Sequence, residues 1–212
     1  MSREQRNELI ASVIAFAVLW LIAWASLPAA AQVPANANVY RITLRQEAQR
    51  VWGPAAPVST LAAQITQESG WRPSVTAWDG GMGLPQFMPA TLRWACREFA
   101  EQLAGERCDP YRPRIGLRLQ SLYLNHLHDH VDQYDDACSR MGFALMDYNS
   151  GKGWRLKRQA RSPEPGNVWV TARINPGVTP ANQRVAQDYP AHVLKRYEPA
   201  FVAAGWGNGS CT

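Results

Sequence analysis

The chain has 212 residues, of which 46% are hydrophobic and 18% are charged. This composition excludes an intrinsically disordered chain, and the length is sufficient for one domain with a buried core. The formal charge of +5 favours an anionic partner, and nucleic acid, a membrane surface and an acidic wall polymer all qualify.

An uncharged, apolar run occupies residues 9–27 and follows Arg3 and Arg6. The small residues at 29–31 fit a signal-peptidase site, so the segment is expected to direct export, with cleavage after Ala31. The run is also just long enough to span a bilayer, which makes an uncleaved anchor in the inner membrane the alternative. Both alternatives place the remaining chain in the periplasm or cell envelope.

Small and polar residues at 32–39 indicate a linker, and residues 41–52 are expected to form a short helix. A proline-rich break at 53–57 separates that helix from the next one. The sequence therefore predicts that the main domain begins near Trp52.

The helix after this break carries its apolar side chains on one face, and Ser59 or Thr60 can cap it. Glu68 lies seven positions after Leu61 and three after Ile65, so it shares the apolar face. Burial and the negative end of the helix both raise the pKa of a carboxyl group placed there. Glu68 can therefore act as an acid near neutral pH, or it can be a structural carboxyl that a hydrogen bond or an arginine satisfies.

The remaining periodicity is also helical. We expect a loop at 71–89, helices after Pro89 and at 115–130 and 136–148, mostly loop at 151–180, and a final helical region at 180–204 that is broken or kinked near Pro190. No internal repeat and no convincing strand alternation is present, so the predicted fold class is mainly α.

Four cysteines, Cys96, Cys108, Cys138 and Cys211, form an even set in a chain expected to enter an oxidising compartment. No CxxC spacing supports a zinc site. Of the three possible pairings we favour Cys96–Cys108, which closes a short loop. Elimination then gives Cys138–Cys211, which would tie down the C-terminus.

Three motifs follow one another in the chain: ESGWRP at 68–73, GGMGLPQFMPAT at 80–91 and YNSG at 148–151. In this order and spacing they resemble the soluble lytic transglycosylase family, which shares a lysozyme-like fold with goose-type lysozyme. The resemblance covers roughly Trp52 to Tyr197. It implies a mainly α, lysozyme-like transglycosylase domain behind the N-terminal export or anchor segment.

The resemblance implies a role for each matching residue. Glu68 matches the catalytic acid and base, with support from the Ser69 hydroxyl and from Tyr148. The residues expected to bind substrate or shape its groove are Gly83, Leu84, Gln86, Asn149 and, by a looser match, Tyr189. Ala77, Pro85 and Asp147 depart from the family pattern, but none of these departures removes a proton-transfer group.

The implied reaction cleaves the β-1,4 bond between N-acetylmuramic acid and N-acetylglucosamine without water and leaves a 1,6-anhydro end. Such an enzyme is a carbon–oxygen lyase that needs one carboxyl group and neither metal nor other cofactor. One alternative is a muramidase of the hydrolase type, in which Asp79 would activate water. A second alternative is a glycan-binding module without catalysis.

Other charged groups are assigned no chemistry. His126, His128 and His130 are expected on a solvated helix face, and the basic stretch at 152–161 holds anionic wall groups or is a solvated loop. The expected partner is therefore the peptidoglycan glycan strand and not nucleic acid, and the protein is expected to be a monomer.

These assignments divide the chain into four parts. They are a signal peptide or anchor at 1–31, a linker and short helix at 32–51, the lytic transglycosylase domain at 52–205 and a tail at 206–212.

Overall fold

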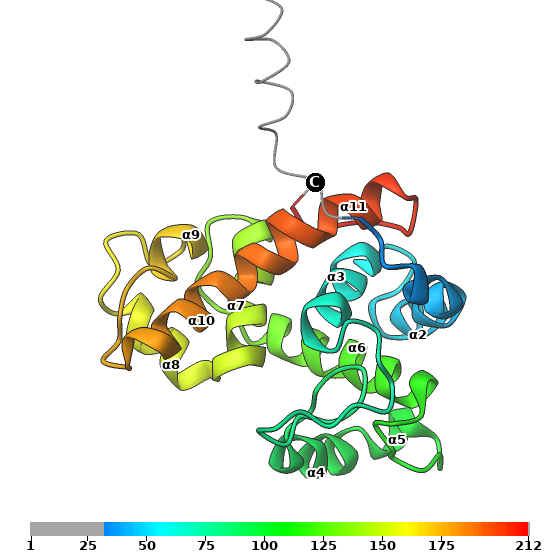
Figure 1. Ribbon diagram of the computed structural model, residues 1–212. Coiled ribbons are helices and arrows are strands. Elements are labelled where there is room, and N and C mark those ends of the chain that lie inside the picture. Colours follow the sequence, from blue (N-terminus) through cyan, green and yellow to red (C-terminus); the bar gives the residue numbers. More distant parts are fainter. Residues whose placement is uncertain (1–31, 212) are drawn as a thin grey trace, which may run out of the picture. The chain divides into compact units, whose positions relative to one another are not determined.

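The computed structural model describes residues 32–211; the predicted export or anchor segment at 1–31 and Thr212 lie outside this range. The described part is built from helices (Figure 1). Its β pairing is restricted to two isolated bridges, in which Met82 pairs with Thr76 and with Phe87. The prediction of a mainly α fold is confirmed. Within residues 32–211, no helix combines the length and hydropathy that crossing a membrane requires.

The chain forms short and long helices in close succession. In order they are η1 (Ala35–Tyr40), α2 (Arg41–Trp52), α3 (Val58–Glu68), α4 (Pro89–Glu98), α5 (Ala100–Leu103), α6 (Pro113–Asp129), α7 (Ala137–Ser150), α8 (Lys152–Gln159), α9 (Val168–Thr171), α10 (Pro180–Ala191), η2 (His192–Tyr197) and α11 (Glu198–Ala203). η1 is a 3₁₀-helix and η2 is a π-helix.

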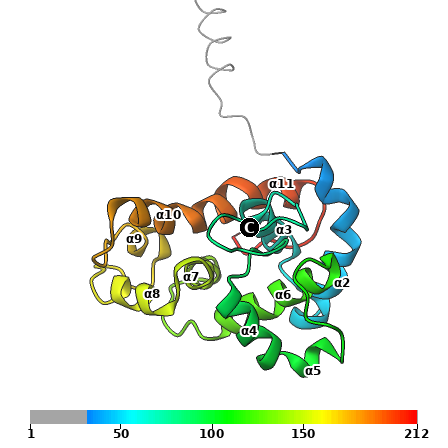
Figure 2. The ribbon, with the colours of Figure 1, turned by 60° about the horizontal axis from the view of Figure 1, so that its bottom comes forward.

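α3 is the central helix, because every residue from Val58 to Ile65 is buried. It packs against α2, η2 and α11, while α6 packs against α2 on one side and α7 on the other. α8, α9 and the first turns of α10 lie at one end of the domain and α2 lies at the opposite end, in both views (Figures 1 and 2). The C-terminal end of α3, which carries Glu68, is therefore held between these two ends.

Two features differ from the sequence-based expectation. The segment 151–180 was predicted to be mostly loop; more than half of it is non-helical, but it also contains the short helices α8 and α9. α8 was missed because its inward face consists of Arg155 and Arg158, each 1% exposed, instead of apolar residues. The last helical region was expected to break or kink near Pro190. It instead continues into the π-helix η2, whose wider turn begins two residues after the proline.

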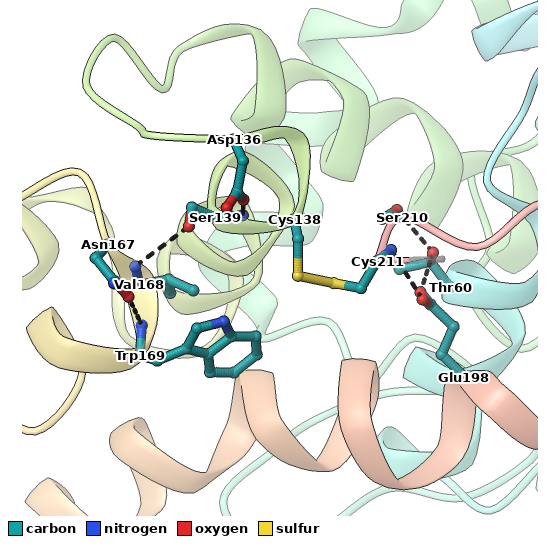
Figure 3. Close-up of a disulfide and its surroundings, with 10 residues drawn as sticks. All are labelled: Thr60, Asp136, Cys138, Ser139, Asn167, Val168, Trp169, Glu198, Ser210 and Cys211. Carbon is teal, nitrogen blue, oxygen red and sulfur yellow. Dashed lines mark hydrogen bonds between the residues drawn. A yellow bond between two sulfur atoms is a disulfide. The ribbon is translucent and has the colours of Figure 1, made fainter.

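Both expected disulfides are present. Cys96–Cys108 joins α4 to the segment that precedes α6, and Cys138–Cys211 joins the start of α7 to the C-terminal segment. Figure 3 shows the second disulfide beside Glu198, which is fully buried and accepts a hydrogen bond from Cys211 N at 3.1 Å. Thr60 of α3 donates to the same carboxylate. The segment predicted as a tail is therefore anchored to the central helix.

A cluster of aromatic rings packs this C-terminal segment against the core. Trp206 is 1% exposed, and its ring lies 4.9 Å from Phe201 and 5.7 Å from Trp71, measured between ring centroids. Trp71 directly follows the ESG sequence at the end of α3, so the C-terminal segment supports the backbone next to Glu68.

Candidate active site

Glu68 is the last residue of α3 and lies in a pocket of about 350 Å³. The side chain is half-buried, and its position follows from the apolar face of α3, which the core covers up to Ile65. The pocket is also lined by residues of α10, η2 and the end of α7, namely Asn149, Arg184, Val185, Asp188, Tyr189 and His192. The structure thus brings Asn149 and Tyr189, two of the predicted binding residues, to the predicted catalytic carboxyl group.

Tyr189 donates its hydroxyl hydrogen to Oε1 of Glu68. Tyr189 is 4% exposed, and the hydroxyl in turn accepts a hydrogen bond from Nε2 of Gln64 at 3.3 Å. Because this bond uses Oε1, the second carboxyl oxygen of Glu68 is available to carry the acidic proton. The tyrosine that matched the family pattern only loosely is the one that contacts Glu68 directly.

A buried pair of glutamines continues this network into the core. Gln120 donates from Nε2 to Oε1 of Gln64 at 2.8 Å and to the carbonyl of Leu61 at 3.0 Å. Both glutamines are 0% exposed, and Oε1 of Gln120 has no hydrogen-bond partner within residues 32–211. Neither glutamine was predicted as a site residue. Two features of the sequence could have indicated them. Gln64 precedes Glu68 by one helical turn, and Gln120 interrupts an apolar run of α6.

The pKa of Glu68 is raised to about 8. Loss of hydration on burial is the largest cause, and the negative charge of Asp79 adds to the rise, whereas the hydrogen bond from Tyr189 opposes it. The pKa of the Tyr189 hydroxyl is also raised well above its ordinary value, mainly by burial. At neutral pH the site therefore holds a protonated carboxyl group beside a neutral tyrosine.

Tyr148 is half-buried and contacts the loop at 71–89. Its hydroxyl donates to the carbonyl of Pro85 at 2.7 Å, and its ring lies 5.2 Å from that of Tyr123 and 5.9 Å from that of Phe87. Burial raises its pKa well above the ordinary value, and the charge of Glu68 adds to this rise. Tyr148 thus lies within electrostatic range of Glu68, but its hydroxyl fixes the loop.

The loop at 71–89 folds back on itself through its own polar groups. Gln86 adopts a positive φ of 51° and donates from Nε2 to the carbonyl of Gly83 at 2.7 Å. Gly83 has a φ of 68°, and a Cβ atom there would lie 2.1 Å from the carbonyl oxygen of Pro110. Only glycine fits this close approach. The loop is thereby held against the segment that precedes α6.

The structure gives two further predicted residues contacts within the domain. Ser69 is 1% exposed, and its hydroxyl donates to the carbonyl of Ile65 at 3.5 Å, not to Glu68, because the end of α3 offers an unsatisfied carbonyl nearby. Leu84 is 0% exposed and belongs to the main core, so it shapes the loop from inside.

Asp79, the candidate second carboxylate, lies in a turn. Its Oδ1 accepts a hydrogen bond from Gly81 N at 3.2 Å. The residue lines a second pocket of about 360 Å³ that shares Asn149 and Val185 with the pocket of Glu68. Asp79 therefore serves a local turn and, through its charge, also acts on Glu68.

The departure at Asp147 proves to be structural. The side chain of Asp147 is 0% exposed, and Nε of Arg155 donates to its two carboxylate oxygens, each at 2.9 Å. Nη1 of Arg155 donates to Oε1 of Gln159 at 2.7 Å. This ion pair joins α7 to α8 directly before Tyr148 and Asn149. The basic stretch is thus not a solvated loop at Arg155.

The histidine series forms no metal site in the described part of the chain. The rings of His126 and His130 lie 4.2 Å apart between centroids and are tilted by 36°, and His130 Nδ1 bonds to the carbonyl of His126 at 2.7 Å. His128 packs edge-on against Trp52. These contacts give the three histidines packing roles at the C-terminal end of α6.

The chain was compared with known protein families and solved structures. Residues 47–167 match the family model of the Transglycosylase SLT domain. The chain resembles an inactive mutant of the lytic transglycosylase Slt from Pseudomonas aeruginosa (TM-score 0.56, 20% identity, 80% of this chain). It also resembles the 70 kDa soluble lytic transglycosylase SLT70 from Escherichia coli (TM-score 0.58, 20% identity, 77% of this chain).

At this identity the two structures show a shared fold. The matches cover only 25% and 24% of those two chains, so this chain corresponds to about a quarter of their length. No curated protein sequence matches the chain.

Proposed function

The chain belongs to the transglycosylase SLT family, and we propose that it is a peptidoglycan lytic transglycosylase that cleaves the bond between N-acetylmuramic acid and N-acetylglucosamine. The observation that carries this proposal is the state of Glu68: a half-buried carboxyl group in a pocket, with a pKa of about 8 and one oxygen free of Tyr189. A carboxyl group in that state is suited to donate a proton at neutral pH.

In the first step, Glu68 protonates the glycosidic oxygen and the bond breaks through an oxocarbenium-like state. The acetamide group of the muramyl residue stabilises the anomeric carbon. Glu68 is now ionised, and the hydrogen bond from Tyr189 to Oε1 becomes stronger because it joins a neutral donor to a charged acceptor.

In the second step, the ionised Glu68 removes the proton from the 6-hydroxyl of the same muramyl sugar. The hydroxyl oxygen attacks the anomeric carbon and closes the 1,6-anhydro ring. Glu68 regains its proton, so one residue acts first as acid and then as base, and no water is consumed.

A hydrolytic muramidase is the second candidate, because Asp79 lies close enough for its charge to raise the pKa of Glu68. Mass spectrometry of the released muropeptides separates the two reactions. The transglycosylase gives anhydro ends that are one water lighter than reducing ends. Release of reducing ends alone would replace the proposed reaction by hydrolysis.

A glycan-binding module without catalysis is the remaining alternative. The Glu68→Gln variant keeps the size of the side chain but cannot donate a carboxyl proton. We expect this variant to bind wall material and to release no soluble fragments. Undiminished clearing of cell walls by Glu68→Gln would remove Glu68 from the mechanism.

We further propose that the protein acts in the cell envelope after export through residues 1–31. The proposal is supported by the apolar run at 9–27 with its preceding arginines. Mass determination of the mature protein tests the cleavage after Ala31, because a mass that still includes Met1 identifies the segment as an uncleaved anchor.

A further inference from the structure

A buried positive charge lies in the wall of the second pocket, next to that of Glu68. Arg158, on α8, lines this pocket of about 360 Å³, although only 1% of the residue is exposed. The pocket adjoins the pocket of Glu68, because Asn149 and Val185 line both. A ligand that extends from the candidate active site into this second pocket therefore passes close to the guanidinium group.

Arg158 has no acidic partner in the described part of the chain. Its Nη1 donates to the carbonyl of Ile174 and to Oε1 of Gln183, both at 2.5 Å, and both acceptors are neutral. Its Nε has no hydrogen-bond partner within residues 32–211. The neighbouring Arg155 differs, because the carboxylate of Asp147 neutralises it.

A buried cation without a counter-charge is costly, since burial removes hydration and two bonds to neutral acceptors replace it only in part. The pKa of Arg158 reflects this, because burial lowers it and no nearby carboxylate acts in the opposite direction. An anion that enters the adjacent pocket would supply the missing charge at short range and in a poorly hydrated setting.

Other groups in the lining suit an anion as well. Asn182 lies in the first turn of α10, a helix of 12 residues, where the helix dipole favours negative charge. The amide groups of Asn149 and Asn182 can donate hydrogen bonds to a carboxylate. The exposed face of Trp154 provides an apolar side wall.

Asp79 is the acidic residue in the same lining, and it limits which anion fits. Its carboxylate is exposed, so water and salt screen it more than they screen Arg158. This opposing charge disfavours a small free anion. A carboxylate tethered to a ligand already held in the pocket of Glu68 benefits from a high effective concentration and can still bind.

We propose that the pocket at Arg158 binds a carboxylate of the glycan strand whose sugar occupies the pocket of Glu68. This inference rests on the proposed function. Muramyl residues present carboxylates in two ways: on the stem peptide or, where the peptide has been removed, on the lactyl group itself. Chains of N-acetylglucosamine present none and serve as the neutral reference.

Binding is measured by calorimetry with the full-length chain carrying Glu68→Gln, so that no ligand is cut. Three ligands of equal sugar number are compared: peptide-bearing glycan strands, peptide-free strands with lactyl carboxylates, and neutral N-acetylglucosamine chains. Arg158→Met and Asn182→Ala are added in this background. Arg161→Met, at an exposed residue of the same basic stretch, is the matched control.

We expect at least one carboxylate-bearing ligand to bind about tenfold more tightly than the neutral chain, and the ligand that does so identifies the carboxylate. Arg158→Met should reduce this preference to less than about threefold, Asn182→Ala should reduce it partly, and Arg161→Met should leave it unchanged. If Arg158→Met does not fold, as judged by circular dichroism, the preference measured for Asn182→Ala tests the proposal in its place.

Equal affinity for all three ligands, or an unchanged preference in a folded Arg158→Met variant, overturns the proposal. Failure of the proposed function looks different: the chain with Glu68 intact would then release no anhydro fragments from wall material. Cleavage without any preference for a carboxylate therefore contradicts only the role of this pocket.

Discussion

Tyr189 and Glu68 are separated by 121 positions in the chain, and the hydroxyl of the first donates to the carboxyl group of the second. α10 supplies the tyrosine and α3 supplies the glutamate. The bond favours the ionised form of Glu68, while burial and the charge of Asp79 disfavour it. The proton affinity of the proposed acid is therefore set by three separate parts of the fold.

Replacing Tyr189 by Phe removes the hydrogen bond and should raise the pKa of Glu68 above its value of about 8. The first step needs protonated Glu68, so activity of the unaltered enzyme should fall as pH rises through about 8, and in Tyr189→Phe this fall should occur at higher pH. kcat should decrease about tenfold or more, because the ionised intermediate loses its donor. The pH dependence of wall cleavage measures both effects, and an alkaline limb at the same pH in both proteins would contradict this assignment.

Glu68→Gln should stabilise the folded protein in a pH-dependent manner. A carboxyl group with a raised pKa in the folded state contributes its full stability below its unfolded pKa of about 4.5 and loses that contribution as pH rises towards 8. Glutamine avoids this loss, so the variant should gain about 4 kcal/mol in the free energy of unfolding at pH 8 and almost nothing at pH 4. Urea unfolding at the two pH values tests the prediction, and an equal effect at both would exclude this cause.

The glutamine pair should show coupling in a double-mutant cycle. Gln64→Leu and Gln120→Leu each leave a buried polar partner unsatisfied and should cost about 1–3 kcal/mol, while the double variant should cost less than the sum. Gln64 alone contacts Tyr189, so Gln64→Leu should also lower kcat several-fold, whereas Gln120→Leu should not. Equal kcat values for the two single variants would show that the pair only supports the core.

The two disulfides should differ in their contribution to stability. They join residues separated by 73 and 12 positions. Replacing Cys138 and Cys211 by Ala should cost about 4 kcal/mol, and replacing Cys96 and Cys108 about 3 kcal/mol, because the longer loop restricts the unfolded chain more. Urea denaturation of the two double variants measures these costs, and a larger loss at Cys96–Cys108 would reverse the expected order.

The sequence was sufficient for the main helices and for Glu68, because the apolar periodicity of α3 places the carboxyl group on the face that is buried. The sequence was insufficient where charged side chains are buried, because hydrophobic periodicity does not predict their burial. Arg155 and Arg158 made 151–161 look like a solvated loop, yet Arg155 pairs with a buried carboxylate and Arg158 donates to the carbonyl of Ile174 and the side-chain amide of Gln183. Only the three-dimensional arrangement provides these partners.

The hydrogen bonds of the site also could not be predicted, because each hydroxyl group has several possible acceptors. The Ser69 hydroxyl bonds to its own helix, and the Tyr148 hydroxyl bonds to Pro85. A motif gives the identity and order of such residues, but local geometry decides which of several acceptors each hydroxyl uses. The partnership of Gln64 with Gln120 depends on the packing of α3 against α6, which no local pattern encodes.

The covalent link from Cys138 to Cys211 encloses Tyr148, Asn149 and Tyr189 in one loop, while Glu68 lies outside it. A protease that cuts the connection between α9 and α10 would thus produce two polypeptides that stay joined through sulfur. Such a clipped molecule should keep its site assembled in an oxidising envelope and separate into two fragments under reductant. Tolerance of a cut at this point therefore depends on the surrounding redox conditions as well as on the fold.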